Sequence, residues 1–306
     1  MRSLRLLAVV AACGLAASSV ALADETTRLA AGSGAIWTCS SAGVIELDAR
    51  SGRILRHAYV GSDYPLQVAL GSGAAWVAHV AGGYTAGGLT RFDLLTGRAT
   101  TRLRLGRVPV FGVAAGVGRV WALTGRTDKA SVTRVDPRTG RGIGVVRGVG
   151  RPTSITADGS GLWVATASGW LLHGAKKVVR LQSHLAPLAP ALGAGSAWIA
   201  GDGKVVRVDE RTDRPVARLR VAGIPVAAAA GRRALWLVVL RRLDQTWLVR
   251  VSTVTNRVQA RRRIPGLTTS IAVGAGGLWL GTVDRIPRVI RVDPKTLELR
   301  MVAELL

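Results

Sequence analysis

Cysteine is scarce in this chain of 306 residues, which contains only Cys13 and Cys39. If a leader is removed from the N-terminus, Cys39 is left alone and no intramolecular disulfide can form. The folded protein would then depend on a packed core rather than on covalent cross-links. Cys39 lies two residues after Trp37, and we expect it to be a small buried strand residue rather than a reactive thiol.

Residues 1–23 have the pattern of a secretory signal. Arg2 and Arg5 precede a short apolar run, and the small residues at its end favour cleavage after Ala23. The pattern predicts a protein that is secreted or kept in the cell envelope. Two alternatives stay open: an uncleaved segment that anchors the chain in a membrane, and a lipid attached to Cys13.

Acidic residues and histidines are also few. The chain has 18 Asp and Glu residues against 42 Lys and Arg residues, and its net charge is +24. The four histidines, His57, His79, His173 and His184, are not spaced for a metal site. No Ser-His-Asp, Cys-His or paired-carboxylate arrangement can be assigned from spacing either. We therefore expect neither a metal nor a cofactor.

The positive charge has two interpretations. It favours an anionic partner, because a field of one sign attracts the other. It can equally reflect a GC-rich genome, since arginine, alanine, glycine and valine are all abundant in the chain. Nucleic acid is the less favoured partner, because the predicted loops lack aromatic residues between the basic ones and the chain is predicted to be exported.

The feature that organises the sequence is a motif of Gly-x-Gly, two further residues and a tryptophan, as in residues 71–76. Five copies are clear and two are weaker. The seven tryptophans are spaced by 39, 45, 42, 35, 38 and 43 residues: Trp37, Trp76, Trp121, Trp163, Trp198, Trp236 and Trp279. Periods near 40 residues with Gly, Trp and Asp punctuation are typical of β-propeller blades.

A second motif predicts the third strand of each blade and the turn after it. Residues 133–140, for example, read Thr-Arg-Val-Asp-Pro-Arg-Thr-Gly. Because these aspartates recur, we interpret them as hairpin residues that cap backbone amides rather than as catalytic groups. In blade six Ser252 takes the place of the aspartate. The next segment alternates arginine with apolar residues, which suits an outermost strand whose charges block edge-to-edge pairing.

These segments predict an all-β fold, a seven-bladed β-propeller with four antiparallel strands per blade, formed as one domain by residues 24–306. We expect the repeated tryptophans to wedge between neighbouring blades. Blade four, which lacks the Asp turn, is expected to be shortened but present. Residues 26–31 and 299–304 are expected to complete separate blades, so that the ring closes by packing alone.

The motifs Pro-x-x-Val-Ala-x-Gly, Gly-x-x-Trp-Val-Ala and Val-x-Arg-Val-Asp-Pro-x-Thr-Gly resemble the bacterial YVTN-repeat and virginiamycin B lyase-like seven-bladed propellers, over about residues 26–306. Members of that group include lyases and surface-binding proteins. Its lyases are understood to use a histidine base in a Glu-x-His pair with a divalent metal, and no histidine of this chain lies in such a pair. The resemblance also implies kinship with quinoprotein-like propellers, in which the repeat tryptophan follows the Thr-Gly turn. Here the tryptophan precedes the aspartate, so we expect no quinone cofactor.

In a propeller, function usually lies on the face formed by the connections between blades and the loops between second and third strands. The basic residues predicted to bind a ligand on this face are Arg107, Arg126, Arg151, Lys204, Arg241, Arg242 and Arg285. The catalytic candidates at the mouth of the channel are His79, Asp63 and Tyr64.

The leading functional prediction is an exported, monomeric, non-catalytic binding or scaffold module. Its basic loop face would hold an anionic ligand, an acidic glycan or a protein partner. The alternative is a lyase- or hydrolase-type enzyme that resembles virginiamycin B lyase. The two hypotheses are distinguished by whether a histidine and a carboxylate lie within hydrogen-bond distance of each other at the channel entrance, as the enzyme hypothesis requires.

Overall fold

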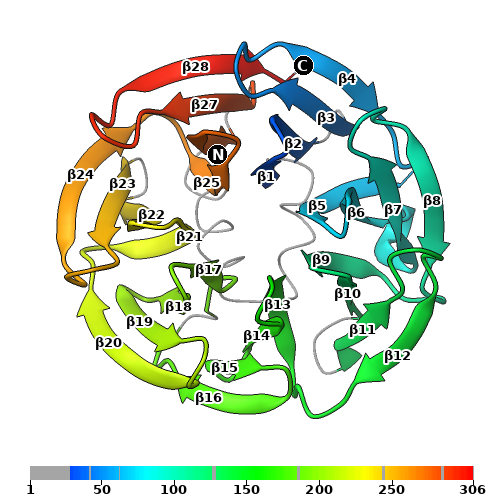
Figure 1. Ribbon diagram of the computed structural model, residues 1–306, viewed down its shortest axis with the longest axis horizontal. Helices are drawn as coiled ribbons and strands as arrows, with labels where there is room; N and C mark the ends of the chain where they lie inside the picture. The colour runs from blue at the N-terminus through cyan, green and yellow to red at the C-terminus, as the bar shows by residue number, and fades with distance from the viewer. Residues whose placement is uncertain are drawn as a thin grey trace.

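The computed structural model describes residues 28–40, 43–61, 63–125, 129–184, 187–242, 245–283 and 286–305. The described chain forms seven four-stranded antiparallel sheets arranged as the blades of a ring (Figure 1). This confirms the predicted seven-bladed β-propeller. The predicted signal, residues 1–23, lies outside the described residues. Within the described ranges no helix is long and apolar enough to cross a membrane.

Each blade is built from four consecutive strands. The first three blades comprise β1 (Arg28–Gly32), β2 (Ala35–Ser40), β3 (Gly43–Asp48), β4 (Ile54–Ala58), β5 (Tyr64–Gly71), β6 (Ala74–Val80), β7 (Gly87–Asp93), β8 (Ala99–Arg104), β9 (Val110–Gly116), β10 (Arg119–Thr124), β11 (Ser131–Val135) and β12 (Gly142–Val146). A short 3₁₀ helix, η1 (Gly82–Tyr84), lies between β6 and β7.

The remaining four blades continue the same order. They comprise β13 (Pro152–Ala157), β14 (Leu162–Thr166), β15 (Trp170–His173), β16 (Lys176–Arg180), β17 (Ala191–Gly193), β18 (Ser196–Gly201), β19 (Lys204–Asp209), β20 (Arg214–Arg220), β21 (Ile224–Ala230), β22 (Ala234–Arg242), β23 (Gln245–Ser252), β24 (Val258–Ile264), β25 (Thr268–Gly274), β26 (Gly277–Thr282), β27 (Arg288–Val292) and β28 (Leu299–Glu304). Blade four, β13 to β16, is present with all four strands, and its third strand, β15, has only four residues, in line with the predicted shortening.

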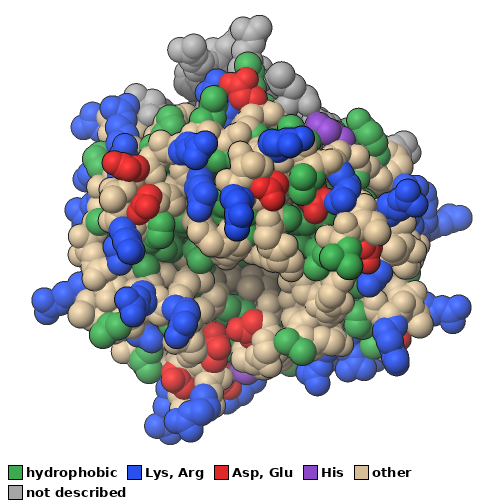
Figure 2. Space-filling view, turned by 45° about the horizontal axis from the view of Figure 1, so that its top comes forward, with side chains coloured by type: hydrophobic (Ala, Val, Ile, Leu, Met, Phe, Trp, Pro, Cys, Tyr) green, Lys and Arg blue, Asp and Glu red, His purple; other side chains and the backbone are tan. Residues whose placement is uncertain are grey.

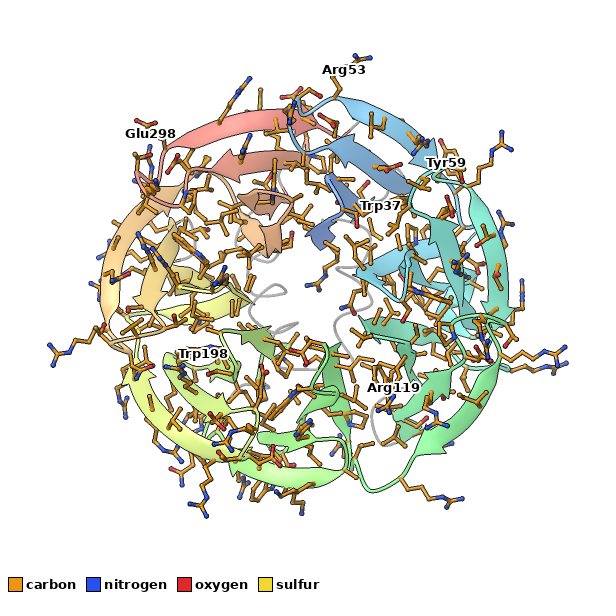
Figure 3. The ribbon with its side chains drawn as sticks, viewed as in Figure 1. Trp37, Arg53, Tyr59, Arg119, Trp198 and Glu298 are labelled. Atoms are coloured by element: carbon orange, nitrogen blue, oxygen red, sulfur yellow. The ribbon has the colours of Figure 1, made fainter. Side chains whose placement is uncertain are left out.

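The repeated tryptophans form the core between blades, as predicted. Each lies on the second strand of its blade and packs against the next blade along the chain. Trp76 of blade two, for example, contacts Val113 and Val120 of blade three in one buried cluster. Figure 3 shows Trp37 and Trp198 within the ring, whereas Arg53 lies at its rim.

The ring closes by packing between blades one and seven, as predicted. Trp279 of blade seven is fully buried against Ile36, Ile45 and Leu47 of blade one. The inner strands approach very closely at such junctions. An added Cβ on Gly71 would lie 2.7 Å from the Ala115 carbonyl oxygen of the next blade. Glycine at the end of the innermost strand therefore permits neighbouring blades to touch backbone to backbone.

The repeated aspartates are turn residues, as predicted. Asp93 accepts hydrogen bonds from the backbone amides of Leu95 and Thr96 at 3.0 and 2.8 Å. Ser252 replaces the carboxylate in blade six, where its hydroxyl oxygen accepts hydrogen bonds from the backbone amides of Val254 and Thr255. The repeat thus supplies the same cap with a different side chain.

The antiparallel order of strands gives the ring two distinct faces. The loops between second and third strands and the connections between blades lie at one end, which we call the loop face. The turns between first and second strands and between third and fourth strands lie at the other end, which we call the turn face. Lys and Arg side chains project from the rim of the molecule (Figure 2).

Candidate functional site

The loop face carries five of the seven residues that the sequence predicts to bind a ligand. Four of them are exposed in connections or at a strand end: Arg107, Arg151, Arg241 and Arg242. Lys204 begins β19 and is partly buried. Arg126 and Arg285 lie outside the described residues. Arg241 is held over the ring of Trp247, with the guanidinium carbon 5.6 Å from the ring centroid.

Two adjoining pockets, of about 410 Å³ and 360 Å³, open between blades four and five. Both are lined by Leu181, Gln182 and Lys204. We call them together the basic groove, because the ionisable residues that complete their lining are Arg180, His184, Arg218 and Arg220. No described Asp or Glu lines either pocket.

Strand pairing explains why these cations gather in one place. Lys204 pairs with Arg220, and Val206 pairs with Arg218, across β19 and β20. Paired and alternate residues of a sheet share one side. Val206 packs against Val179 of blade four, so this side of blade five faces blade four. The three cations therefore project toward the groove.

Two of the groove cations are held by carbonyl oxygens. Lys204 Nζ donates to the Gln182 carbonyl, and Arg180 Nε donates to the Ser168 carbonyl at 3.0 Å. Each bond uses one N–H, whereas a lysine ammonium has three and an arginine guanidinium has five. The side chains are thereby positioned while they keep donors for an anion.

His79 and Asp63, the catalytic candidates, do lie together on the loop face. His79 Nδ1 is 2.7 Å from Asp63 Oδ2, and His79 Nε2 is 3.2 Å from the Thr90 hydroxyl. Only 6% of the His79 side chain and 11% of the Asp63 side chain are exposed. Tyr64, the third candidate, is exposed and begins β5.

The environment of His79 favours its neutral form. Burial lowers the pKa of His79, and this effect outweighs the hydrogen bond and charge of Asp63, which raise it. A neutral imidazole can donate through Nδ1 to Asp63 and accept the Thr90 hydroxyl at Nε2. A general base needs a nitrogen that faces the substrate proton. The observed contacts instead fasten the β4–β5 connection to β6 and β7.

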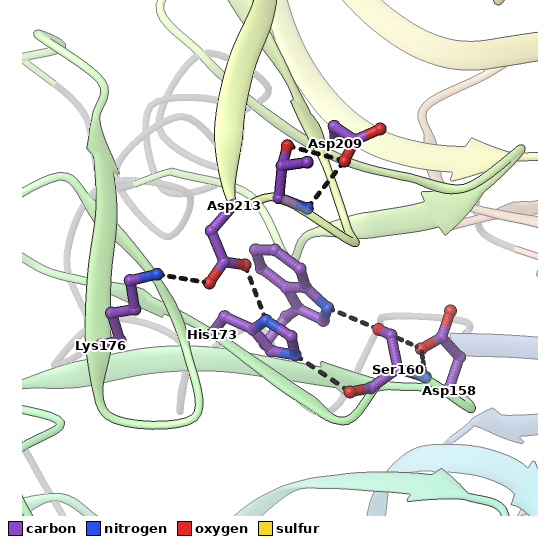
Figure 4. A network of polar contacts seen from close by, with 8 residues as sticks. Asp158, Ser160, His173, Lys176, Asp209 and Asp213 are labelled. Atoms are coloured by element: carbon purple, nitrogen blue, oxygen red, sulfur yellow. Dashed lines mark hydrogen bonds and ion pairs between the residues drawn. The ribbon is translucent and has the colours of Figure 1, made fainter.

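A second polar cluster lies on the turn face, between blades four and five (Figure 4). His173 Nδ1 is 2.8 Å from Asp213 Oδ1, and Lys176 Nζ is 2.9 Å from Asp213 Oδ2. His173 Nε2 is 3.0 Å from the Ser160 carbonyl oxygen. The Ser160 hydroxyl in turn donates to Asp158 at 2.7 Å. We call these five residues the interblade cluster.

Neighbouring groups shift the pKa values of two acidic residues in and beside the interblade cluster. Partial burial raises the pKa of Asp213, but hydrogen bonds from Lys176 and His173 prevail and hold this pKa below its usual value. The pKa of Glu210, beside the cluster, shifts in the opposite direction. Burial and the charge of Asp158 raise the pKa of Glu210 to about 7. Its Oε1 atom is buried without a hydrogen-bond partner among the described residues.

His173 occupies a position that is basic in most blades. The residue paired with the repeat tryptophan across the second and third strands is arginine in five blades: Arg91, Arg134, Arg207, Arg250 and Arg291. Blade one has Glu46 there, bonded to Arg56, and blade four has His173. No motif in the sequence predicts the interblade cluster. The missing Asp turn of blade four was the one signal that could have drawn attention to it.

The described residues contain neither a cluster that could bind a metal ion nor a reactive thiol. They contain no group of three or more His, Cys, Asp and Glu side chains that could hold a metal ion. Cys39 is fully buried on β2, as predicted, and burial raises the pKa of its thiol. A thiol in that state is a poor nucleophile.

The chain matches no family model, and no curated protein matches its sequence. Among solved structures, a chain in the crystal structure of a mitotic checkpoint complex is similar, with a TM-score of 0.67 and 12% identity over 84% of each chain. Dihydro-heme d1 dehydrogenase NirN in complex with DHE has a TM-score of 0.57 at 14% identity. That match covers 92% of this chain and 65% of the other. At these identities the likeness shows the β-propeller fold alone.

Proposed function

We propose that this protein is a non-catalytic binding or scaffold module whose basic groove holds an anionic ligand or an acidic segment of a protein partner. The observation that supports the proposal is the lining of the two pockets. Four cations converge there, and the described lining has no carboxylate. The β-propeller fold is compatible with such a role, because its loop face and blade junctions offer concave surfaces on a rigid ring.

The physical basis is electrostatic. The net charge of +24 attracts anions over the whole surface. Within a recess, low-dielectric walls concentrate that field, and arginine forks can bond carboxylate, sulfate or phosphate oxygens in pairs. Lys204 and Arg180 are already fastened to the protein by one bond each, so less side-chain freedom is lost on binding.

Binding of the full chain to dextran sulfate, with neutral dextran as control, tests the proposal. We expect saturable binding to dextran sulfate that weakens steeply with salt. The variant R180A/R218A/R220A should raise Kd about tenfold, since exposed ion pairs contribute about 0.5 kcal/mol each. The matched control, R261A/R262A/R263A, removes the same charge from β24 and should change Kd far less.

Two results would contradict the proposal. Equal weakening by the groove variant and by the β24 variant would show that net charge, rather than the groove, attracts the polymer. Binding lost only in R241A/R242A would move the site to the exposed end of β22, on the loop face outside the groove.

Two finer aspects belong to the same proposal. The repeat motifs support membership of the YVTN-repeat and virginiamycin B lyase-like propellers. The pattern of residues 1–23 supports export, and thus a partner outside the cytoplasm. Mass determination of the mature protein after expression in a bacterial host would test the expected cleavage after Ala23.

A further inference from the structure

The outermost strand of blade three differs from the other outermost strands. β12 reads Gly-Ile-Gly-Val-Val and has no charged residue. Every other outermost strand carries at least one Arg or Lys. In β12, Ile143 is 48% exposed and Val145 is 58% exposed. Apolar side chains therefore stand in solvent on a strand that lacks the charges present on its counterparts.

The free edge of such a strand can pair with another chain. An outermost strand presents unpaired N–H and C=O groups along its outer side, and charged side chains normally prevent pairing there. Figure 1 shows β12 at the rim of the ring, with β11 on its inner side and no described strand on its outer side. The pairing of third and fourth strands has an irregular register in every blade, β12 included, so it does not set β12 apart. Charge protects six of the edges and is absent from β12.

The residues that flank β12 indicate what kind of strand it would accept. Arg141 and Arg147 border the strand, and both are exposed. Neither forms an ion pair within the described residues. An antiparallel second copy centred on Gly144 would bring Arg141 at one end of each β12 near Arg147 of the other. Like charges that face each other across a strand pair destabilise it, so a second copy is disfavoured.

We propose that β12 is a docking edge for an extended apolar segment of a protein partner, with an acidic residue at each end of that segment. Main-chain hydrogen bonds to β12 would supply much of the affinity. The exposed side chains of Ile143 and Val145 would pack against β-branched residues of the added strand. Arg141 and Arg147 would pair with the two acidic residues and set the register.

The test uses the full chain and a fluorescent peptide of alternating valine and threonine with aspartate at both ends. We expect saturable binding by fluorescence anisotropy and slowed hydrogen exchange of the β12 amides. V145K, which gives β12 the charge its counterparts have, should weaken binding about tenfold or more. V216K is the matched control, because Val216 is 53% exposed on β20, an outermost strand that already carries arginine.

Several outcomes would overturn the proposal. They are the absence of binding, equal binding by V145K, and equal binding of a peptide with lysine at both ends. Loss of binding in R180A/R218A/R220A would place the peptide in the basic groove instead. A dimer in sedimentation that disappears in V145K would make a second copy the occupant. Folding of each variant is checked by circular dichroism, and I143K provides a second, independent substitution on the same strand.

Discussion

The imidazole of His173 lies flat against the indole of Trp163, with ring centroids 4.2 Å apart and planes inclined by 4°. The two residues pair directly across β14 and β15. The stack directs both ring nitrogens sideways, one to Asp213 of blade five and the other to the Ser160 carbonyl of blade four. His173 therefore joins two blades where other blades place an arginine over the tryptophan, as Arg207 does over Trp198 at 5.1 Å.

Replacement of His173 by alanine should destabilise the protein by about 2–3 kcal/mol, because it removes two hydrogen bonds and an aromatic stack. Urea unfolding of the two proteins measures the difference. His57→Ala is the control, since His57 is exposed on β4 and should lie within about 0.5 kcal/mol of the parent. Equal losses in both variants would show that the stack contributes nothing specific.

Glu210 should make stability fall as pH rises. Its carboxyl group has a pKa of about 7 in the folded protein against 4.5 as the ordinary value. The folded state therefore binds more protons than the unfolded state between these values, and its stability declines from about pH 4.5 to pH 7. Glu210→Gln should remove this part of the decline, so Tm should exceed that of the parent at pH 8 more than at pH 5. A constant difference between the two proteins would refute this assignment.

Trp279 should be essential to the closure of the ring. Trp279→Ala should cost about 3–5 kcal/mol, the usual range for a buried tryptophan. Because Trp279 packs against blade one, amide exchange should accelerate in β1 and β2 as well as in its own blade. Exchange that accelerates only in blade seven would contradict closure by this contact.

Gly71 should not tolerate a side chain. Its added Cβ would meet the Ala115 carbonyl oxygen at 2.7 Å, and both atoms belong to inner strands that cannot move freely. We expect Gly71→Ala to lower stability by about 1–3 kcal/mol. Gly159→Ala is the matched control, because no atom lies within 4 Å of its added Cβ and the residue is exposed in a turn. Thermal unfolding of both variants gives the comparison.

Much of the fold could be predicted because it is repeated locally. The Gly-x-Gly motif and its tryptophan, in weaker form in blades four and six, mark the first turn and second strand of each blade, and the Asp motif marks the turn between the third and fourth strands where it is present. Each feature depends on residues close in sequence. Even blade four, which lacks the Asp motif, retains enough of the pattern around Trp163 to be recognised.

The sites were harder to predict because they depend on neighbouring blades. Lys204 was predicted as a ligand-binding residue from its place in a loop, but its companions Arg218 and Arg220 looked like ordinary edge charges. Asp213 lies 40 residues from His173, and no local pattern connects them. Nothing in the sequence shows that Glu210 Oε1 is buried.

The number of blades, the tryptophan core and the turns follow from the amino-acid sequence alone, because short-range hydrogen bonds and the alternation of apolar residues act within each repeat. Tertiary structure alone decided the basic groove, the interblade cluster and the contacts of His79. These depend on how closely one blade approaches the next, and that distance is set by packing across the ring rather than by the residues of any single repeat.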